Sequence, residues 1–131
     1  MEDEKLINAA LDARDRAYAP YSRFAVGAAV LGESGRVYSG SNVENASYGL
    51  TMCAERVAIF KAISEGEKRL AALAVAADTA LPASPCGACR QVMAEFGINK
   101  VIMCNTRGEK RTVTLAELLP HAFEKADLPE E

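Results

Sequence analysis

The chain has 131 residues, which suits a single domain. Half of its residues are hydrophobic and a quarter are charged, as in ordinary globular proteins, and its net charge of −3 argues against nucleic-acid binding, which requires a basic face. Apolar runs fall short of the ~20 residues that cross a bilayer, and the acidic start Met1–Glu4 differs from the positively charged start of a signal peptide. We therefore expect one domain over residues 1–131, a cytoplasmic location, and neither a membrane nor a nucleic-acid partner.

The first half of the chain predicts a helix, a hairpin and a second helix. Apolar residues recur at helical spacing over the first 18 residues, until Pro20 interrupts the pattern. Two extended runs, 24–31 and 36–41, are separated by a short glycine-containing gap, which predicts a β-hairpin. Thr51 is the expected N-cap of the next helix, which runs towards Gly66.

Beyond residue 69 the pattern alternates between strand and helix. Residues 70–77 are apolar nearly throughout, which is typical of a buried parallel strand. Ser84 and Pro85 predict the cap and first turn of a helix that carries residues 86–96. Residues 100–104 form another expected strand.

The end of the chain predicts one more strand and a short helix. The gap between residues 104 and 111 is too short for a parallel crossover, so the strand at 111–113 should pair antiparallel with its predecessor. Thr114 and Glu117 have the spacing of a capping box. The order of elements predicts an α/β fold with a five-stranded mixed sheet and helices on both faces.

Three of the four cysteines stand in two motifs that predict a metal site. The motifs are Cys53-Ala54-Glu55-Arg56 and Pro85-Cys86-Gly87-Ala88-Cys89-Arg90. Cysteines of a cytosolic chain more often bind metals than form disulfides. Three thiolates leave one tetrahedral position of a zinc ion open, as in catalytic zinc sites. Both motifs are expected at helix N-termini, where the partial positive charge favours thiolates.

Charged residues beside Cys53 have the chemistry to complete such a site. The Glu55 carboxylate could move the protons of a metal-bound water, although residues two apart on an ideal helix do not face each other. Arg56 lies three residues after Cys53, on the same helical face, and would offset the thiolate charge. Gln91 is a weaker candidate for the same tuning role.

A purely structural zinc site is the alternative, with Cys104 or His121 as the fourth ligand. A lone C-x-x-C motif would favour it, whereas the two motifs together favour catalysis. Cys104 fits a small buried strand residue, and His121 fits an exposed residue after a short helix.

At these residues the chain resembles the zinc-dependent cytidine deaminases, of the small homotetrameric type that uses three cysteines. The resemblance covers nearly the whole chain. Besides the cysteine motifs it includes Tyr18-Ala19-Pro20-Tyr21-Ser22-Arg23-Phe24, Val26-Gly27-Ala28-Ala29, Asn42-Val43-Glu44-Asn45 and Leu118-Leu119-Pro120. It implies a three-layer α/β/α fold, one Zn²⁺ per subunit held by Cys53, Cys86 and Cys89, and a homotetramer with active sites shared between subunits.

The reaction implied by the resemblance is hydrolytic deamination of cytidine and 2′-deoxycytidine to uridine and 2′-deoxyuridine plus ammonia, in pyrimidine salvage. A zinc-activated hydroxide would attack C4 of the base, and Glu55 would shuttle the proton to N3 and then to the departing amine. One alternative is a deaminase of a related aminopyrimidine nucleoside antibiotic, and another is the structural-zinc module without catalysis. A nucleic-acid editing deaminase is disfavoured because the chain is acidic and leaves no room for a helix between the last two strands.

The resemblance also implies the substrate contacts. They are Phe24 against the base, Asn42, Val43 and Glu44 around the ribose, the Ala54 backbone and the carbonyl region near Ser84 at the base edge, and Tyr48 and Phe123 from neighbouring subunits. From sequence alone, Asn42 could instead cap a turn, Glu44 could be solvated and Phe24 could be strand core. His121 stands where this family usually has a glycine before Ala122-Phe123, which bears on the path of the tail.

Overall fold

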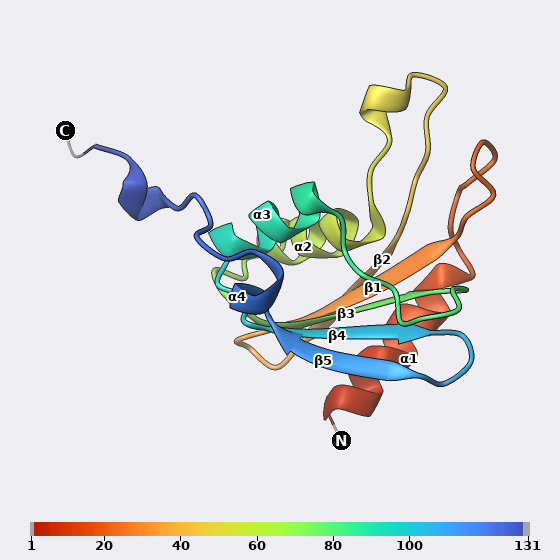
Figure 1. The fold of residues 1–131 in the computed structure, drawn as a ribbon, viewed down its shortest axis with the longest axis horizontal. Helices are drawn as coiled ribbons and strands as arrows, with labels where there is room; N and C mark the ends of the chain where they lie inside the picture. Colours follow the sequence, from red (N-terminus) through yellow and green to blue (C-terminus); the bar gives the residue numbers. More distant parts are fainter. Residues whose placement is uncertain (1, 130–131) are drawn as a thin grey trace.

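The computed structural model describes residues 2–129, and a five-stranded mixed sheet forms its middle layer (Figure 1). The strand order is β2-β1-β3-β4-β5. The strands are β1 (Val26–Gly32), β2 (Val37–Ser41), β3 (Leu70–Ala77), β4 (Lys100–Asn105) and β5 (Lys110–Thr114). Only β3 and β4 pair in parallel, and the other neighbours in this sheet are antiparallel. The predicted mixed sheet is confirmed.

Helices cover both faces of the sheet. Helix α1 (Glu2–Arg14) lies on one face, and α2 (Ala54–Ser64) and α3 (Gly87–Glu95) lie on the other (Figure 1). The core is split accordingly. Leu6 of α1 packs in one cluster with Ile102, whereas Ile59 of α2 packs in the other with Leu73 and Val101. The three-layer α/β/α prediction is therefore confirmed.

Three short helical segments complete the described chain: η1 (Tyr48–Leu50), α4 (Leu115–Leu118) and η2 (Lys125–Asp127). Helix α4 begins with the predicted capping box, in which the Thr114 side chain accepts from Glu117 N at 3.3 Å and the Glu117 carboxylate accepts from Thr114 N at 2.9 Å. Strands β4 and β5 pair antiparallel, as the short gap between them predicts. Within residues 2–129, no helix has the length and apolarity to cross a bilayer.

The starts of the two central helices differ from the prediction. Thr51 and Ser84-Pro85 were expected to begin them, but the N-cap residues are Cys53 and Cys86, both with extended backbone. The hydroxyl of Thr51 instead accepts a hydrogen bond from Asn45 N at 3.1 Å. The Ser84 hydroxyl accepts one from Arg90 Nη2 at 2.8 Å. These two hydroxyl groups bond to partners other than the free N–H groups at the helix starts, and each helix begins one residue after a cysteine.

Candidate active site

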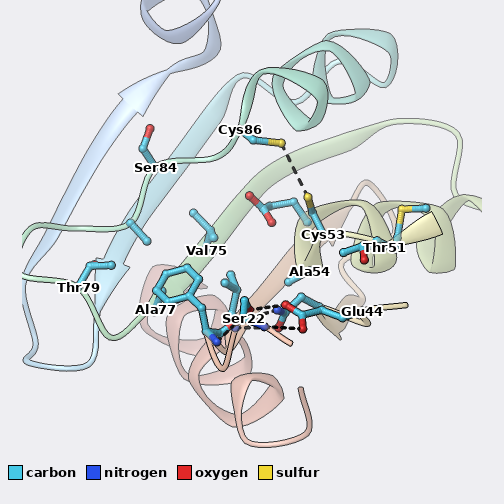
Figure 2. A pocket seen from close by; sticks show the side chains of 16 residues that line it. Ser22, Glu44, Thr51, Cys53, Ala54, Val75, Ala77, Thr79, Ser84 and Cys86 are labelled. Carbon is cyan, nitrogen blue, oxygen red and sulfur yellow. Dashed lines mark hydrogen bonds between the residues drawn. The ribbon is translucent and has the colours of Figure 1, made fainter. Parts of the chain in front are cut away.

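The sulfur atoms of Cys53, Cys86 and Cys89 lie within 4.8 Å of one another. Cys53 Sγ is 3.8 Å from Cys86 Sγ (Figure 2), and Cys86 Sγ is 3.4 Å from Cys89 Sγ. Zinc–sulfur bonds of about 2.3 Å in a tetrahedron place sulfurs about 3.8 Å apart, so the three side chains fit a zinc ion. Two of the cysteines are helix N-caps, and Cys89 lies in the first turn of α3. The predicted clustering of the three cysteines is confirmed, in a geometry able to hold a metal ion.

The fourth position of this cluster is free of protein ligands. Within residues 2–129, no further histidine, cysteine or acidic side chain joins the three sulfurs. Cys104 is buried in β4, and burial raises the pKa of its thiol to about 11, so it remains a neutral core residue. His121 is exposed after α4. These positions do not support the structural-zinc alternative.

The cluster holds one readily formed thiolate. Hydrogen bonds from the thiol of Cys89, from the Arg56 guanidinium and from the Cys86 thiol lower the pKa of Cys53 to about 5. The same bond with Cys53, together with burial, raises the pKa of Cys89. The Cys89 proton therefore leaves when a cation binds, which couples metal binding to proton release.

Arg56 reaches the cluster as its helical spacing predicts. Its Nη2 donates to Cys53 Sγ at 3.2 Å, and this bond raises the pKa of Arg56. In the described part of the chain, its buried Nε lacks a hydrogen-bond partner. The guanidinium is thus directed at the thiolate, and it brings a positive charge to a sulfur-rich site.

Glu55 is buried, with 4% of its surface exposed, and lines the same cavity as Cys53 and Cys86. Burial raises the pKa of its carboxyl to about 7, and the negative charge of Cys53 adds to the effect. Cys53 precedes the first helical turn and has extended backbone, so the rule for residues two apart on a helix does not apply to this pair. The carboxyl can therefore both accept and donate a proton near neutral pH.

A cavity of about 310 Å³ adjoins the cluster. Val75 and Ala77 of β3 form part of its wall, and Thr79 and Ser84 come from the loop between β3 and α3 (Figure 2). Ala54 at the start of α2 also lines it. The volume lies at the lower end of the range for small-molecule sites, about 300–1,000 Å³.

Asn42 and Glu44 line the cavity and also fix the segment that carries Phe24. Asn42 Oδ1 accepts from Val26 N at 2.9 Å, and Nδ2 donates to Phe24 O at 2.8 Å. The Glu44 carboxylate accepts from Ser22 N at 3.1 Å and from the Ser22 hydroxyl (Figure 2). It also accepts from Tyr21 N at 2.9 Å. The bond with the Ser22 side chain is the main cause of the lowered pKa of Glu44.

The remaining residues of the predicted site do not line this cavity, although Tyr48 lines an adjoining hollow that shares Ser22 and Glu44 with it. Val43 bridges to Met52 through backbone bonds of 2.9 and 3.0 Å. Tyr48 is 77% exposed on η1, and Phe123 is 59% exposed in the tail. Gln91 Nε2 donates to the Phe123 carbonyl at 2.6 Å, so its bonding partner is the tail.

Sequence reasoning missed Ser22, Thr79 and Ala83 as cavity-lining residues. They lie in loops, where periodicity carries no signal. It also passed over Arg90, although the residue stands in a quoted motif. Two of its three side-chain hydrogen bonds reach back five and six residues into an irregular segment, and the third, to Leu118 O, joins segments that only the fold brings together.

Three cysteine sulfurs with an open ligand position, beside a buried carboxyl in a cavity of an α/β/α fold, define a zinc-dependent hydrolase. A family model described as the cytidine and deoxycytidylate deaminase zinc-binding region matches residues 1–105. The chain therefore belongs to the cytidine deaminase family, as the motifs predict.

Proteins similar to this chain match it over nearly its whole length. It is 55% identical over 130 residues to the cytidine deaminase of Sporosarcina psychrophila, covering 98% of this chain and 96% of the relative. The cytidine deaminase of Halalkalibacterium halodurans is also 55% identical, with 98% of each chain covered. The crystal structure of the Burkholderia pseudomallei cytidine deaminase matches with a TM-score of 0.90 and 50% identity, covering 94% of this chain and 100% of that one.

Proposed function

We propose that this chain, as one domain over residues 1–131, deaminates free cytidine and 2′-deoxycytidine to uridine and 2′-deoxyuridine plus ammonia, in pyrimidine salvage. The single observation that carries the proposal is the cluster of Cys53, Cys86 and Cys89 with the buried Glu55 lining the same cavity. Four free cysteines fit the reducing cytoplasm as the place of action.

The three cysteines would hold a zinc ion, which when bound is a Lewis acid that activates water near neutral pH. Glu55 is the group that moves protons. As a base it takes a proton from the attacking water and delivers it to N3 of the pyrimidine. It then passes a second proton to the amine that leaves C4 as ammonia. Burial, which raises the pKa of this carboxyl, suits a group that must both take and give protons.

Asn42 and Glu44 have hydrogen-bonding capacity left for a ribose. The Asn42 amide carries two N–H groups, of which one donates to Phe24 O, and the Glu44 carboxylate has further lone pairs. Both residues line the cavity, as does Phe24. We infer that Val43 serves this contact through its backbone, and that the Ala54 backbone meets the base edge.

We also infer a homotetramer whose active sites are shared. Tyr48 and Phe123 have the largest exposed fractions among the aromatic side chains of residues 2–129. The loop that carries η1 and the tail that carries Phe123 both extend away from the layers (Figure 1). Segments that extend in this way are suited to reach a neighbouring subunit.

The decisive experiment compares Glu55→Gln with the unaltered enzyme in an ultraviolet assay of cytidine, alongside zinc analysis. We expect Glu55→Gln to keep one zinc per chain and to lose about 10²- to 10⁴-fold in kcat. Glu65→Gln, at the exposed end of α2, is the matched control and should behave like the wild type. Wild-type kcat in Glu55→Gln would refute the proposal. Faster turnover of an aminopyrimidine nucleoside antibiotic than of cytidine would identify that nucleoside as the preferred substrate.

A further inference from the structure

The Arg90 side chain binds three acceptors in two separate segments of the chain, Ser84–Pro85 and the end of α4. Its Nε donates to Pro85 O at 2.9 Å, Nη2 donates to Ser84 Oγ at 2.8 Å, and Nη1 donates to Leu118 O at 2.7 Å. It directly follows Cys89 on α3. The half-buried guanidinium thus uses each of its nitrogens.

Two of these bonds hold the segment that leads into the metal cluster. Ser84 lines the cavity, Pro85 is fully buried, and the next residue is Cys86 (Figure 2). A backbone bond of 3.0 Å from Ala83 N to Cys104 O ties the start of this segment to β4. Between that bond and the first turn of α3, Arg90 supplies the hydrogen bonds that hold Ser84 and Pro85 in place.

The third bond joins this segment to the end of the chain. Leu118 is the last residue of α4, and its carbonyl points at the guanidinium. The neighbouring Gln91 holds the Phe123 carbonyl at 2.6 Å. Adjacent side chains of α3 therefore fix the cavity wall, the end of α4 and the start of the tail relative to one another.

We propose that Arg90 is a positioning residue for deamination, which fixes the Ser84–Pro85 wall and, through it, Cys86 relative to Glu55. The inference rests on the proposed function of the cavity. The role is one of geometry, because Arg56 already supplies a positive charge in direct contact with a sulfur. A planar fork that serves three acceptors in different directions is specific to arginine, and lysine offers only one nitrogen.

The test measures zinc release to a chelator, without substrate, and kcat and KM for cytidine. We expect Arg90→Lys to release zinc about 10- to 100-fold faster and to lose kcat by a similar factor, as for other residues that orient metal ligands. KM should change far less, because Asn42 and Glu44 lie on another wall. Ser84→Ala removes one bond of the three and should show a smaller loss of the same kind. Arg107→Ala, at an exposed turn, is the control and should match the wild type.

Wild-type zinc release and kcat in Arg90→Lys would overturn the proposal, because charge alone would then suffice. An equal loss in kcat without faster zinc release would also overturn it. The test does not depend on the more disruptive Arg90→Ala, which removes all three bonds, because Arg90→Lys and Ser84→Ala decide the question even if that variant fails to fold. If the wild type does not turn over cytidine, the proposed function fails, whereas the zinc-release comparison still tests the positioning role.

Discussion

At the scale of single residues, the negative charge of the sulfur cluster limits how strongly a bound metal ion can activate water. Three thiolates on a divalent ion leave a net charge of about −1, which makes the ion a weaker activator of water than a three-histidine site does. Arg56 opposes this charge through its 3.2 Å bond to Cys53 Sγ. A unit charge about 4 Å away, at an effective dielectric constant of about 20, contributes on the order of 4 kcal/mol. This value is an upper bound, because the site adjoins a cavity.

We therefore expect Arg56→Gln to fold and bind zinc but to lose about 10- to 100-fold in kcat/KM for cytidine. Arg56→Lys keeps the charge and should retain more activity than the glutamine variant. The loss in thermal stability should be moderate, because removal of the Nε, which is buried without a partner within residues 2–129, offsets part of the loss of the bond to Cys53 Sγ. Metal analysis, thermal unfolding and steady-state kinetics check these outcomes. Wild-type kinetics in Arg56→Gln would contradict the tuning role.

Local spacing could predict some of the site and not the rest. The approach of Arg56 to Cys53 fits the relation between an N-cap residue and the third residue of its helix, because Cys53 caps α2 and Arg56 is at the N3 position, a pair that capping motifs bring together. The cavity shared by Cys53 and Glu55 depends on the extended backbone of an N-cap residue, which helix geometry does not describe. The partner of Gln91 lies 32 residues away in the chain. Contacts of that kind are decided by the fold.

Among the secondary-structure elements, too, the features set by local sequence were predicted and those set by tertiary contacts were not. Strand β3 has the predicted bounds, Leu70–Ala77, because an apolar run between polar segments marks a buried strand clearly. The antiparallel pairing of β4 and β5 follows from a chain-length argument and is confirmed. The N-caps of α2 and α3 each lie two residues after the predicted ones, because the hydroxyls of Thr51 and Ser84 make contacts that local capping preferences do not include.

Glu67 connects the β1–β2 hairpin with the loop before β3. Its carboxylate accepts hydrogen bonds from the Ser34 hydroxyl and from Tyr38 Oη, the latter at 2.9 Å. The bond from Ser34 is the main cause of the lowered pKa of Glu67. Gly32 allows this approach, because a Cβ atom there would lie 2.3 Å from the carboxyl carbon of Glu67.

Because the pKa of Glu67 is lower in the folded state, its contribution to stability is complete above the unfolded value of about 4.3. It is lost as the pH falls through the lower, folded value. We expect the difference in free energy of unfolding between wild type and Glu67→Gln to stay constant from pH 7 to pH 5 and to shrink in more acidic buffer. Urea unfolding at each pH measures it, and loss of zinc in acid affects both proteins alike. Glu65→Gln should show no such trend, and a difference that grows in acid would contradict the assignment.

For the whole molecule, the proposed assembly predicts a mass in solution. Four copies of a 14.0 kDa chain give about 56 kDa, which light scattering separates clearly from a monomer or dimer. Charge does not oppose association strongly, since each chain carries a net charge of only −3. A monomer of full activity would contradict the shared site.

Shared sites have a sharper consequence than mass, because two defects can then be placed in different subunits. The metal cluster and Glu55 belong to one chain, whereas Phe123 would enter the site of a neighbour. We expect Phe123→Ala and Glu55→Gln each to be impaired when assembled alone. Co-assembly should restore some sites, since an intact Glu55 on one chain would meet an intact Phe123 on the next.

The measurement is kcat/KM for cytidine after co-expression and purification of the mixed oligomer. The control is co-expression of each variant with a chain that carries both changes, which creates no intact site beyond those present in either variant. Activity of the mixed oligomer no higher than the average of the two parents would show that each active site is built from a single chain.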